Sequence, residues 1–235
     1  MRFTIDKAIF GNYPGLRLGA VIAKNISNVG NSGEFSDKFK SLQEEVRLKL
    51  NHGLLSQQPK IACWRRAYSS FGAKPKGHKS SVENLYSLIL RGGTVRPINK
   101  LVDIYNFISI KHMLPVGGED LGKVRGGIIL TLARENEPPV LLLGDKEPRP
   151  PHKGEVIYKD DISAICRRWN WREADRTKLT EGTNNCFLVV EGLPPVGKTE
   201  IETATKEMSD LVEKYCGGLV RPAILDETLP GLTLD

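Results

Sequence analysis

Three polar side chains interrupt an apolar stretch at residues 99–113 and could bind a small polar ligand. Asn99, Asp103 and Asn106 are spaced four and three residues apart, so a helix would place them on one face. Amide and carboxylate groups in this arrangement can hold a water molecule or a carbonyl group. The alternative is that Asp103 and Asn106 only cap or brace neighbouring backbone.

A glycine pair followed by two acids comes directly after this stretch. Gly117 and Gly118 are predicted to form a turn at which the backbone can approach a ligand closely. Glu119 and Asp120 lie beside that turn, so a carboxylate would be available to the same ligand. We therefore predict a ligand site within residues 99–120.

A second polar run, residues 166–175, combines tryptophan with arginine. If it were a strand, alternation would divide its side chains between two faces, with Arg167, Trp169, Trp171 and Glu173 on one and Arg168, Asn170 and Arg172 on the other. Flat aromatics flanked by guanidinium groups suit stacking against bases or a ribose–phosphate end. The alternative for the two tryptophans is packing in the core.

Several other chemistries lack support in the sequence. No Ser–His–Asp or Cys–His arrangement is recognisable from spacing, which argues against a nucleophilic hydrolase. The four cysteines are scattered, with no CxxC pair and no His at ligand spacing. We therefore expect buried free thiols, no metal and no disulfide.

Residues 192–199, GLPPVGKT, match the phosphate-binding pattern GxxxxGK[ST]. We reject that interpretation because Pro194 and Pro195 have no backbone N–H to offer a phosphate. Only 36 residues follow Thr199, too few to assemble a nucleotide-hydrolase sheet. Thr199 and Glu202 instead predict a capping box at a helix start. We expect no nucleotide cofactor.

Helices are expected to dominate the first half of the chain. Two short strands, 3–10 and 19–23, are predicted to precede a helix over 35–50. A short basic and aromatic segment, 63–71, and a Gly/Pro/Lys-rich loop lead to a helix that Ser80 or Ser81 could cap. The next helix is predicted to span 99–113.

Strands are expected to dominate the second half. The predicted strands are 128–133, 140–143, 156–158, 163–168 and 186–190, followed by a closing helix, 200–215, and a last strand, 220–225. Strands and helices do not alternate regularly, which favours an α+β fold over a doubly wound sheet. With no internal repeat, we predict a single domain, 1–235, with N-terminal strands and a helix in 1–59.

Positive charge is concentrated in one segment. Residues 60–100 contain nine Lys or Arg and one acid, a net +8, so the rest of the +6 chain sums to about −2. Clustered cations beside aromatics such as Trp64 and Tyr68 are typical of surfaces that meet nucleic acid; the alternative is a solvated basic surface. No apolar run reaches the roughly 18–20 residues that cross a bilayer, and no signal peptide is apparent. We expect no membrane contact and a cytoplasmic location.

Three separated blocks of sequence resemble one family. They are FGAKPKGHKSS, INKLVDIYNFISIKHMLPVGGEDL and RPPHKGEVIYKDDISAICRRWNWREADRTKLTEGTNNCFLVVEGLPPV. Together they are similar to the tRNA-editing (B-three/B-four) domain of the phenylalanyl-tRNA synthetase β subunit, and most to its freestanding relatives. The resemblance covers about 60–225. It implies an α+β fold with a mixed, partly barrel-like β-sheet and flanking helices.

The resemblance also implies positions for the site. Glu173 falls where the synthetase module has a pocket glutamate that reads the amino acid's side chain, and Asn106 falls at a helix asparagine near the pocket mouth. Thr180 and Thr183 fall in a turn that borders the pocket. Gly117 stands where the module commonly has His, so no role of that His transfers to this chain.

The implied activity is trans-editing, the hydrolysis of the ester of a released mischarged tRNA. An aminoacyl ester is already activated, so a positioned water suffices and no covalent nucleophile is needed. Glu173, Glu119 and Asn106 are the predicted catalytic residues, and Gly117, Gly118, Asp103, Trp169, Thr180 and Thr183 the predicted substrate-binding residues. The predicted RNA-binding cations are Arg65, Arg66, Lys74, Lys76, Lys79, Arg91, Arg167 and Arg172.

Two other functions remain as alternatives. A non-catalytic tRNA-binding or aminoacyl-tRNA-binding module would share the basic segment but would not need Glu173 for turnover. A small-molecule amino-acid binder or hydrolase would be indifferent to neutralisation of Lys74, Lys76 and Lys79. The amino acid could be a standard misactivated one or a non-protein mimic such as an arginine analogue. The acids of the predicted pocket favour a cationic one.

Overall fold

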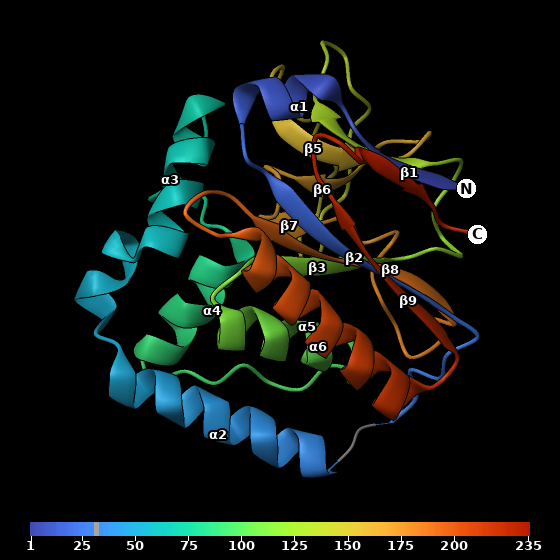
Figure 1. Cartoon of the computed structure of the whole chain (residues 1–235). Helices are drawn as coiled ribbons and strands as arrows, with labels where there is room; N and C mark the ends of the chain where they lie inside the picture. Colours follow the sequence, from blue (N-terminus) through green and yellow to red (C-terminus); the bar gives the residue numbers. More distant parts are fainter. Residues whose placement is uncertain (31–32) are drawn as a thin grey trace.

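The computed structural model describes residues 1–30 and 33–235, which form two packed β-sheets flanked by helices (Figure 1). The helices are α1 (Lys7–Asn12), α2 (Gly33–Lys49), α3 (Pro59–Ser70), α4 (Ser81–Leu90), α5 (Lys100–His112) and α6 (Lys198–Cys216), with a 3₁₀ turn at His52–Gln57. The strands are β1 (Arg2–Ile5), β2 (Arg17–Lys24), β3 (Val116–Asp120), β4 (Ile128–Leu132), β5 (Val156–Lys159), β6 (Ala164–Arg167), β7 (Arg172–Glu173), β8 (Asn185–Gly192), β9 (Leu219–Leu225) and β10 (Gly231–Thr233).

The two sheets confirm the predicted α+β class. The six-stranded sheet has the order β10-β1-β4-β5-β6-β7 and is mixed, because β1 and β4 run parallel while its other pairs are antiparallel. The four-stranded sheet has the order β3-β8-β2-β9 and is antiparallel. Neither sheet closes into a barrel within the described residues. Both contain strands from the N-terminal and C-terminal parts of the chain.

Alternation along β8 shows how the layers are built. Phe187 and Val189 face the six-stranded sheet and join its apolar core, together with Phe3 of β1. Leu188 and Val190 face the opposite way, into a second core formed with α5 and α6. The four-stranded sheet is therefore the central layer, buried on both faces. No helix within 1–30 and 33–235 is long and apolar enough to cross a membrane.

Ser80, one of the two predicted capping residues, caps α4 through a side-chain oxygen that accepts a backbone N–H. Asn99, predicted to lie on one helix face with Asp103 and Asn106, instead caps α5 in the same way. The capping box of α6 is different from the one predicted. Gly197 N donates to Glu200 Oε2 at 3.1 Å, so the helix begins before Thr199, and Glu202 lies within it.

Several predicted elements are wrong. The strand predicted over 3–10 ends at Ile5, because Asp6 accepts a hydrogen bond from Ala8 N and starts α1. Residues 63–70, part of the basic and aromatic segment for which no element was predicted, belong to the helix α3. Residues 140–143 form only isolated bridges instead of a strand. The predicted glycine turn at Gly117-Gly118 is strand β3, paired with β8.

Candidate functional site

A cavity of about 290 Å³ lies between the two sheets. Its floor is the inner face of β3 and β8, where Gly117 pairs with Val189 and Glu119 pairs with Phe187. Side chains two apart on a strand share a face, so Glu191 extends the same surface along β8. We call this space the acidic cavity, because carboxyl groups lie on more than one of its walls.

The remaining walls come from the six-stranded sheet and from two helices. The six-stranded sheet contributes Tyr158, Cys166 and the β6–β7 hairpin, and the helices contribute the start of α4 and one face of α5. Glu173 lies opposite the floor on β7, and Tyr105 and Asn106 project from α5. Asn106, Gly117, Gly118, Glu119, Trp169, Arg172 and Glu173, all predicted from the sequence, therefore line one cavity.

Glu191 ties the floor of the cavity to the other sheet. Its carboxylate accepts hydrogen bonds from the Tyr158 hydroxyl, from Trp169 Nε1 at 2.9 Å and from the Asn170 amide. The Tyr68 hydroxyl of α3 in turn donates to Asn170 Oδ1 at 2.9 Å. Burial raises the pKa of Glu191 to about 7, although these three donors act in the opposite direction.

Glu119 and Glu173 are the two acids that have no such set of donors. Burial raises the pKa of Glu173 to about 7. Burial, and the neighbouring charge of Glu173 after it, raise the pKa of Glu119 well above the ordinary value for a carboxyl group. Glu119 Oε2 is buried and has no hydrogen-bond partner among the described residues. Burial therefore favours the protonated form of both carboxyl groups, and Glu173 is poised between its two protonation states near pH 7.

This separation permits acid–base chemistry at neutral pH. A carboxyl group that titrates near 7 can accept a proton from water, while a protonated neighbour can donate a hydrogen bond to a developing negative charge. Asn106, 9% exposed, adds an amide to the same wall. The cavity can therefore bind an amino group, orient a water and stabilise an oxyanion.

Two other titratable groups of the cavity stay neutral. Burial and the neighbouring carboxylates raise the pKa of the Cys166 thiol well above its ordinary value. Burial likewise raises the pKa of Tyr105 well above 10, with Glu173 and Glu119 as further causes. Cys166 therefore lacks the thiolate that a nucleophilic cysteine requires.

The two glycines of β3 serve different purposes. A Cβ atom built on Gly117 meets nothing within 4 Å, and Gly117 lines the cavity, so the missing side chain leaves open space there. A Cβ on Gly118 would lie 2.3 Å from Leu188 Cδ2, so Gly118 is needed for close packing. Gly117 thus leaves space for a ligand on one face of β3, and Gly118 allows close packing against Leu188 on the other.

The β6–β7 connection does not have the strand-like alternation considered for residues 167–173. Arg168 and Trp169 have left-handed backbone, with φ of 47° and 66°, so the chain turns instead of alternating. Trp169 is fully buried. Trp171 is half-buried and stacks with two guanidinium groups, those of Arg168 at 4.5 Å and Arg172 at 4.3 Å from its ring centroid. One tryptophan packs in the core and the other lies at the surface of the site.

Three predicted substrate-binding residues lie outside the lining of the cavity. Asp103 is buried, and its Oδ1 accepts a hydrogen bond from Ile98 N at 2.8 Å, before the first turn of α5. Thr183 Oγ1 donates to Asp120 Oδ2 at 2.8 Å. Thr180 is exposed, and its N–H donates to Thr183 Oγ1. These contacts brace the loops behind β3.

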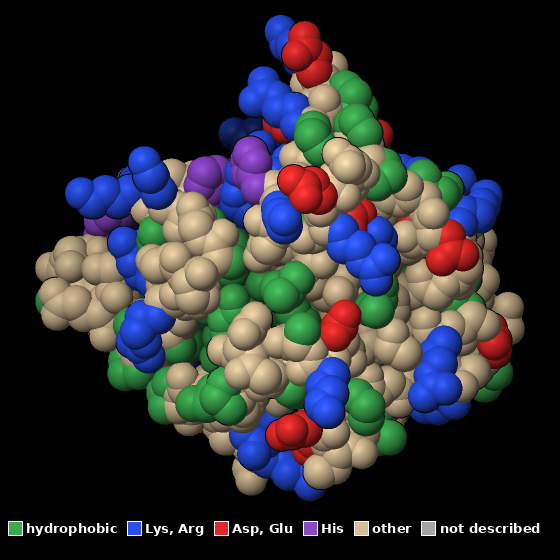
Figure 2. All heavy atoms as spheres, turned by 90° about the horizontal axis from the view of Figure 1, so that it is seen from above, with side chains coloured by type: hydrophobic (Ala, Val, Ile, Leu, Met, Phe, Trp, Pro, Cys, Tyr) green, Lys and Arg blue, Asp and Glu red, His purple; other side chains and the backbone are tan. Residues whose placement is uncertain are grey.

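The predicted RNA-binding cations divide into two groups. Arg66, Lys74 and Lys76 are exposed. The others contact protein groups: Arg65 pairs with Glu83, Lys79 donates to Ser87, Arg91 donates to His52, Arg167 pairs with Glu155 and Arg172 pairs with Asp145. Arg167 is only 4% exposed, so its charge is committed to Glu155. Figure 2 shows Lys, Arg and His side chains gathered together on one face of the molecule.

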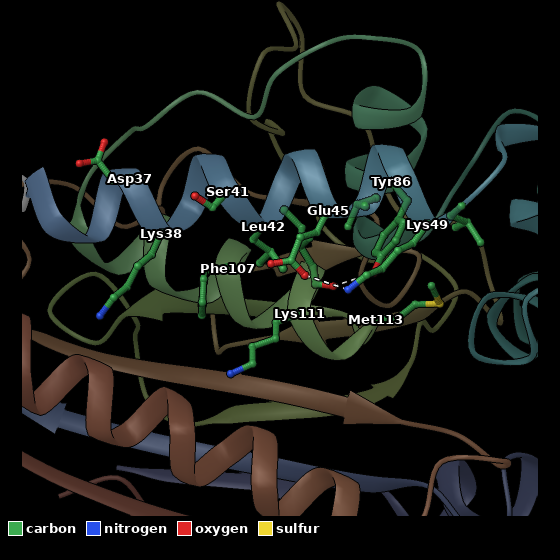
Figure 3. Close-up of a pocket in the computed structure, with 13 residues that line it drawn as sticks. Asp37, Lys38, Ser41, Leu42, Glu45, Lys49, Tyr86, Phe107, Lys111 and Met113 are labelled. Atoms are coloured by element: carbon green, nitrogen blue, oxygen red, sulfur yellow. Dashed lines mark hydrogen bonds and ion pairs between the residues drawn. The ribbon is translucent and has the colours of Figure 1, made fainter.

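A larger groove between α2 and α5 has a different character (Figure 3). Its volume is about 700 Å³, and its apolar lining, including Leu42 and Phe107, continues a core cluster. Its lysines are paired: Lys49 with Glu45 along α2, and Lys111 with Glu207 of α6. No set of polar groups converges there. Among the residues that the structure describes, no cluster of His, Cys, Asp or Glu could hold a metal ion.

The sequence reasoning missed Glu191, Tyr105, Cys166 and Arg168. Glu191 lies between the predicted strand, 186–190, and the phosphate-loop match, 192–199, and was assigned to neither. The signal that could have found it is the period of two along β8, because Phe187, Val189 and Glu191 share a face. A glutamate that ends an apolar face of a buried strand is unusual enough to indicate a polar site.

The sequence was also compared with known proteins. The model of the B3/4 domain family matches residues 63–217. Two similar proteins are phenylalanine–tRNA ligase beta subunits. That of Fusobacterium nucleatum is 31% identical over 106 residues, 45% of this chain and 13% of the subunit. That of Cereibacter sphaeroides is 30% identical over 145 residues, 62% of this chain and 17% of the subunit. The chain thus spans less than a fifth of either ligase subunit.

A third relative is similar in length to this chain. The uncharacterized protein YhzB of Bacillus subtilis is 20% identical over 219 residues, 93% of this chain and 96% of that protein. Among solved structures, an N-terminal fragment of the phenylalanyl-tRNA synthetase beta subunit from Pyrococcus horikoshii superposes with a TM-score of 0.47 at 11% identity. That match covers 96% of this chain and 54% of the fragment.

Proposed function

The chain belongs to the B3/4 domain family, and from that membership we propose that it hydrolyses the ester of a mischarged tRNA, as a trans-editing aminoacyl-tRNA deacylase. The observation that carries the proposal is the acidic cavity, in which Glu119, Glu173 and Asn106 converge between the two sheets. The relatives from Fusobacterium nucleatum and Cereibacter sphaeroides are subunits of a ligase that is named for phenylalanine and tRNA. The cavity supplies the chemistry for this chain.

The volume of the cavity favours an amino acid as its occupant. At about 290 Å³ it lies at the small end of the range of roughly 300–1,000 Å³ that is typical of ligand sites. A nucleotide would fill or exceed it, so the nucleoside end of the substrate would remain outside. Buried carboxyl groups favour an amino group inside, either the α-ammonium or a cationic side chain.

The proposed reaction requires only water and proton transfer. Glu173, in its ionised form, accepts a proton from a bound water as the water oxygen attacks the carbonyl carbon of the ester. The bond between that carbon and the ribose oxygen then breaks, and the proton passes to the leaving ribose hydroxyl. Free amino acid and tRNA are the products. Cys166 takes no part as a nucleophile, because its thiol remains protonated.

Three groups are placed to stabilise the oxyanion. Protonated Glu119 and the Asn106 amide can donate from adjoining walls. Within residues 1–30 and 33–235, β3 is an edge strand whose one partner is β8, and Asp120 N donates outward to Thr177 O. The antiparallel alternation places the N–H of Gly118 at that same outer edge. Fixed donors of this kind typically contribute 10²–10³-fold each.

The test is deacylation of a panel of radiolabelled correct and mischarged aminoacyl-tRNAs. We expect wild type to hydrolyse at least one mischarged species and Glu173→Ala to lose at least about 100-fold in rate. Glu181→Ala, which changes an exposed glutamate, is the matched control and should retain full activity. Salt-sensitive tRNA binding without hydrolysis of any species would replace the deacylase with a non-catalytic binding module.

A further inference from the structure

A second cleft adjoins the acidic cavity and carries the opposite charge. Its volume is about 750 Å³, and five of its lining residues are cationic, whereas only Asp145 and Glu147 are acidic. We call it the arginine cleft; its cations are Lys146, Arg149, Arg167, Arg168 and Arg172. Trp171 and Arg172 line both spaces, so they form the wall between the cleft and the cavity.

The positive charge of the arginine cleft is only partly neutralised by the protein. Arg167 forms a buried pair with Glu155, and Arg172 pairs with Asp145 at 2.7 Å. Among residues 1–30 and 33–235, no carboxylate lies within ion-pair distance of Lys146, Arg149 or Arg168. His78, which also lines the cleft, has a buried Nδ1 without a hydrogen-bond partner in the same part of the chain. The cleft therefore presents donors in excess.

The backbone turn and a stacked ring direct Arg168 into the arginine cleft. Its own left-handed φ of 47°, followed by 66° at Trp169, sends the two side chains in opposite directions, one into the cleft and the other into the core. Non-glycine residues in this region are strained by about 1 kcal/mol or more and cluster at functional sites. The Arg168 guanidinium lies 4.5 Å from the centre of the Trp171 ring, which fixes its plane.

The surroundings of Arg168 disfavour its charge in the unliganded protein. Burial lowers the pKa of Arg168, and the guanidinium groups of Arg167 and Arg172 lower it further, although Glu155 acts in the opposite direction. Burial, and then Arg168, lower the pKa of His78. A planar guanidinium that is held on an aromatic ring among like charges is suited to bidentate contact with a phosphate.

We propose that the arginine cleft binds the terminal phosphodiester of the RNA strand whose 3′ end carries the amino acid held in the acidic cavity, with Arg168 as the principal phosphate ligand. This inference rests on the proposed function and identifies how the same site recognises RNA. It assigns the role to Arg168, Arg149 and Lys146, because Arg167, the neighbour expected from the sequence to contact RNA, is occupied by Glu155. Trp171 positions Arg168 and separates the phosphate from the ester.

The experiment compares two esters of the same amino acid. One is the 3′-aminoacyl ester of adenosine, which has no phosphate, and the other is the ester of cytidylyl-adenosine, which has one phosphodiester. For wild type we expect kcat/KM to be at least about tenfold higher with the dinucleotide, as one charge-assisted contact provides. Arg168→Ala should abolish that preference by raising KM, leave kcat and the adenosine ester unchanged, and be partly rescued by Arg168→Lys.

A charge-matched control accompanies the variant. Lys206→Ala removes an exposed cation of α6 and should change neither ester's kinetics. If Arg168→Ala slows both esters equally, or leaves the dinucleotide unaffected, the phosphate assignment is wrong. Circular dichroism of the variants checks that they keep the secondary structure of wild type.

Equilibrium binding separates failure of this inference from failure of the proposed function. If wild type hydrolyses neither ester, the deacylase proposal fails. Binding of a single-stranded RNA that ends in CCA and carries no amino acid still tests the cleft. Its log Kd should depend on log salt with a slope that falls by about 0.7 in Arg168→Ala. An unchanged slope contradicts the proposal. Inorganic phosphate that binds as tightly as the RNA would make the cleft a free-anion site and would overturn it too.

Discussion

The acidic cavity and the arginine cleft share a wall but confine their charges in different ways. Glu119 and Glu191 are 7% and 2% exposed, so removal from water controls their protonation. Arg149 and Lys146 are exposed, so solvent and salt screen them. The same wall thus separates a site whose behaviour depends on pH from one whose behaviour depends on ionic strength. Burial, more than charge, decides what each side can do.

The most severe test of this contrast removes one glutamate from each side. Glu191→Ala leaves the Tyr158 hydroxyl, Trp169 Nε1 and the Asn170 amide without their shared acceptor. We expect it to lower the free energy of unfolding by about 4 kcal/mol, measured by urea denaturation. Glu147→Ala, on the exposed rim of the cleft, should change it by less than about 0.5 kcal/mol. Equal losses would mean that burial does not distinguish the two sides.

A pH series sharpens the comparison within the cavity. The pKa of Glu173 is about 7 in the folded chain and 4.5 as its ordinary value, so the folded state holds the proton more tightly. Glu173 should therefore remove about 3 kcal/mol from the stability of wild type as pH rises from about 4.5 to 7, in addition to the losses in the same direction that the raised pKa values of Glu191 and Glu119 cause.

Glu173→Gln cannot ionise and should escape that loss. It should be the more stable protein at pH 8, with no difference from wild type at pH 4, in urea titrations at both pH values. Glu181→Gln, in an exposed loop, is the control for a general effect of removing a negative charge. A variant that is less stable than wild type at pH 8 would show that the Glu173 carboxylate is not desolvated.

The smallest expected effect is a difference in stability between two alanine variants of β3, one at a packed glycine and one at a glycine beside the cavity. Gly118→Ala places a methyl group against Leu188, and we expect it to cost about 2 kcal/mol of stability. Gly117→Ala should stay within about 0.5 kcal/mol, because its methyl group enters the cavity. Thermal unfolding of both variants measures the difference. If Gly117→Ala were as destabilising as Gly118→Ala, the open space assigned to the cavity beside Gly117 would be absent.

The sequence predicted elements whose signals are local and missed those that depend on neighbours. Ser80 marks the start of its helix because a cap needs only the next turn of backbone. β3 was missed because Gly117 and Gly118 have no strand propensity, and only pairing with β8 extends them. The left-handed pair at Arg168 and Trp169 breaks an alternation that the sequence otherwise favours, because the buried Trp169 ring and its bond to Glu191 outweigh local preference.

The site was predictable where a polar residue interrupts an apolar pattern. Asn106, Glu119 and Glu173 stand out in this way, and the structure brings them to one cavity. Residue type alone did not indicate which cations are available. Arg167 and Arg168 are adjacent and identical in type, but one is buried against Glu155 and the other faces the cleft. The difference between the two arginines arises from the left-handed turn that begins at Arg168.

The β6–β7 turn has a consequence for how specificity can diverge among descendants of this chain. Within residues 168–171, one side chain serves the core, another the cleft and a third the wall between the two spaces. A substitution that moves this backbone alters folding and both recognition events together, so selection can rarely improve one without harming another. Gly117 on β3 and the start of α4 line the cavity without that double burden. Changes of amino-acid preference should therefore accumulate at those positions, while the turn stays fixed.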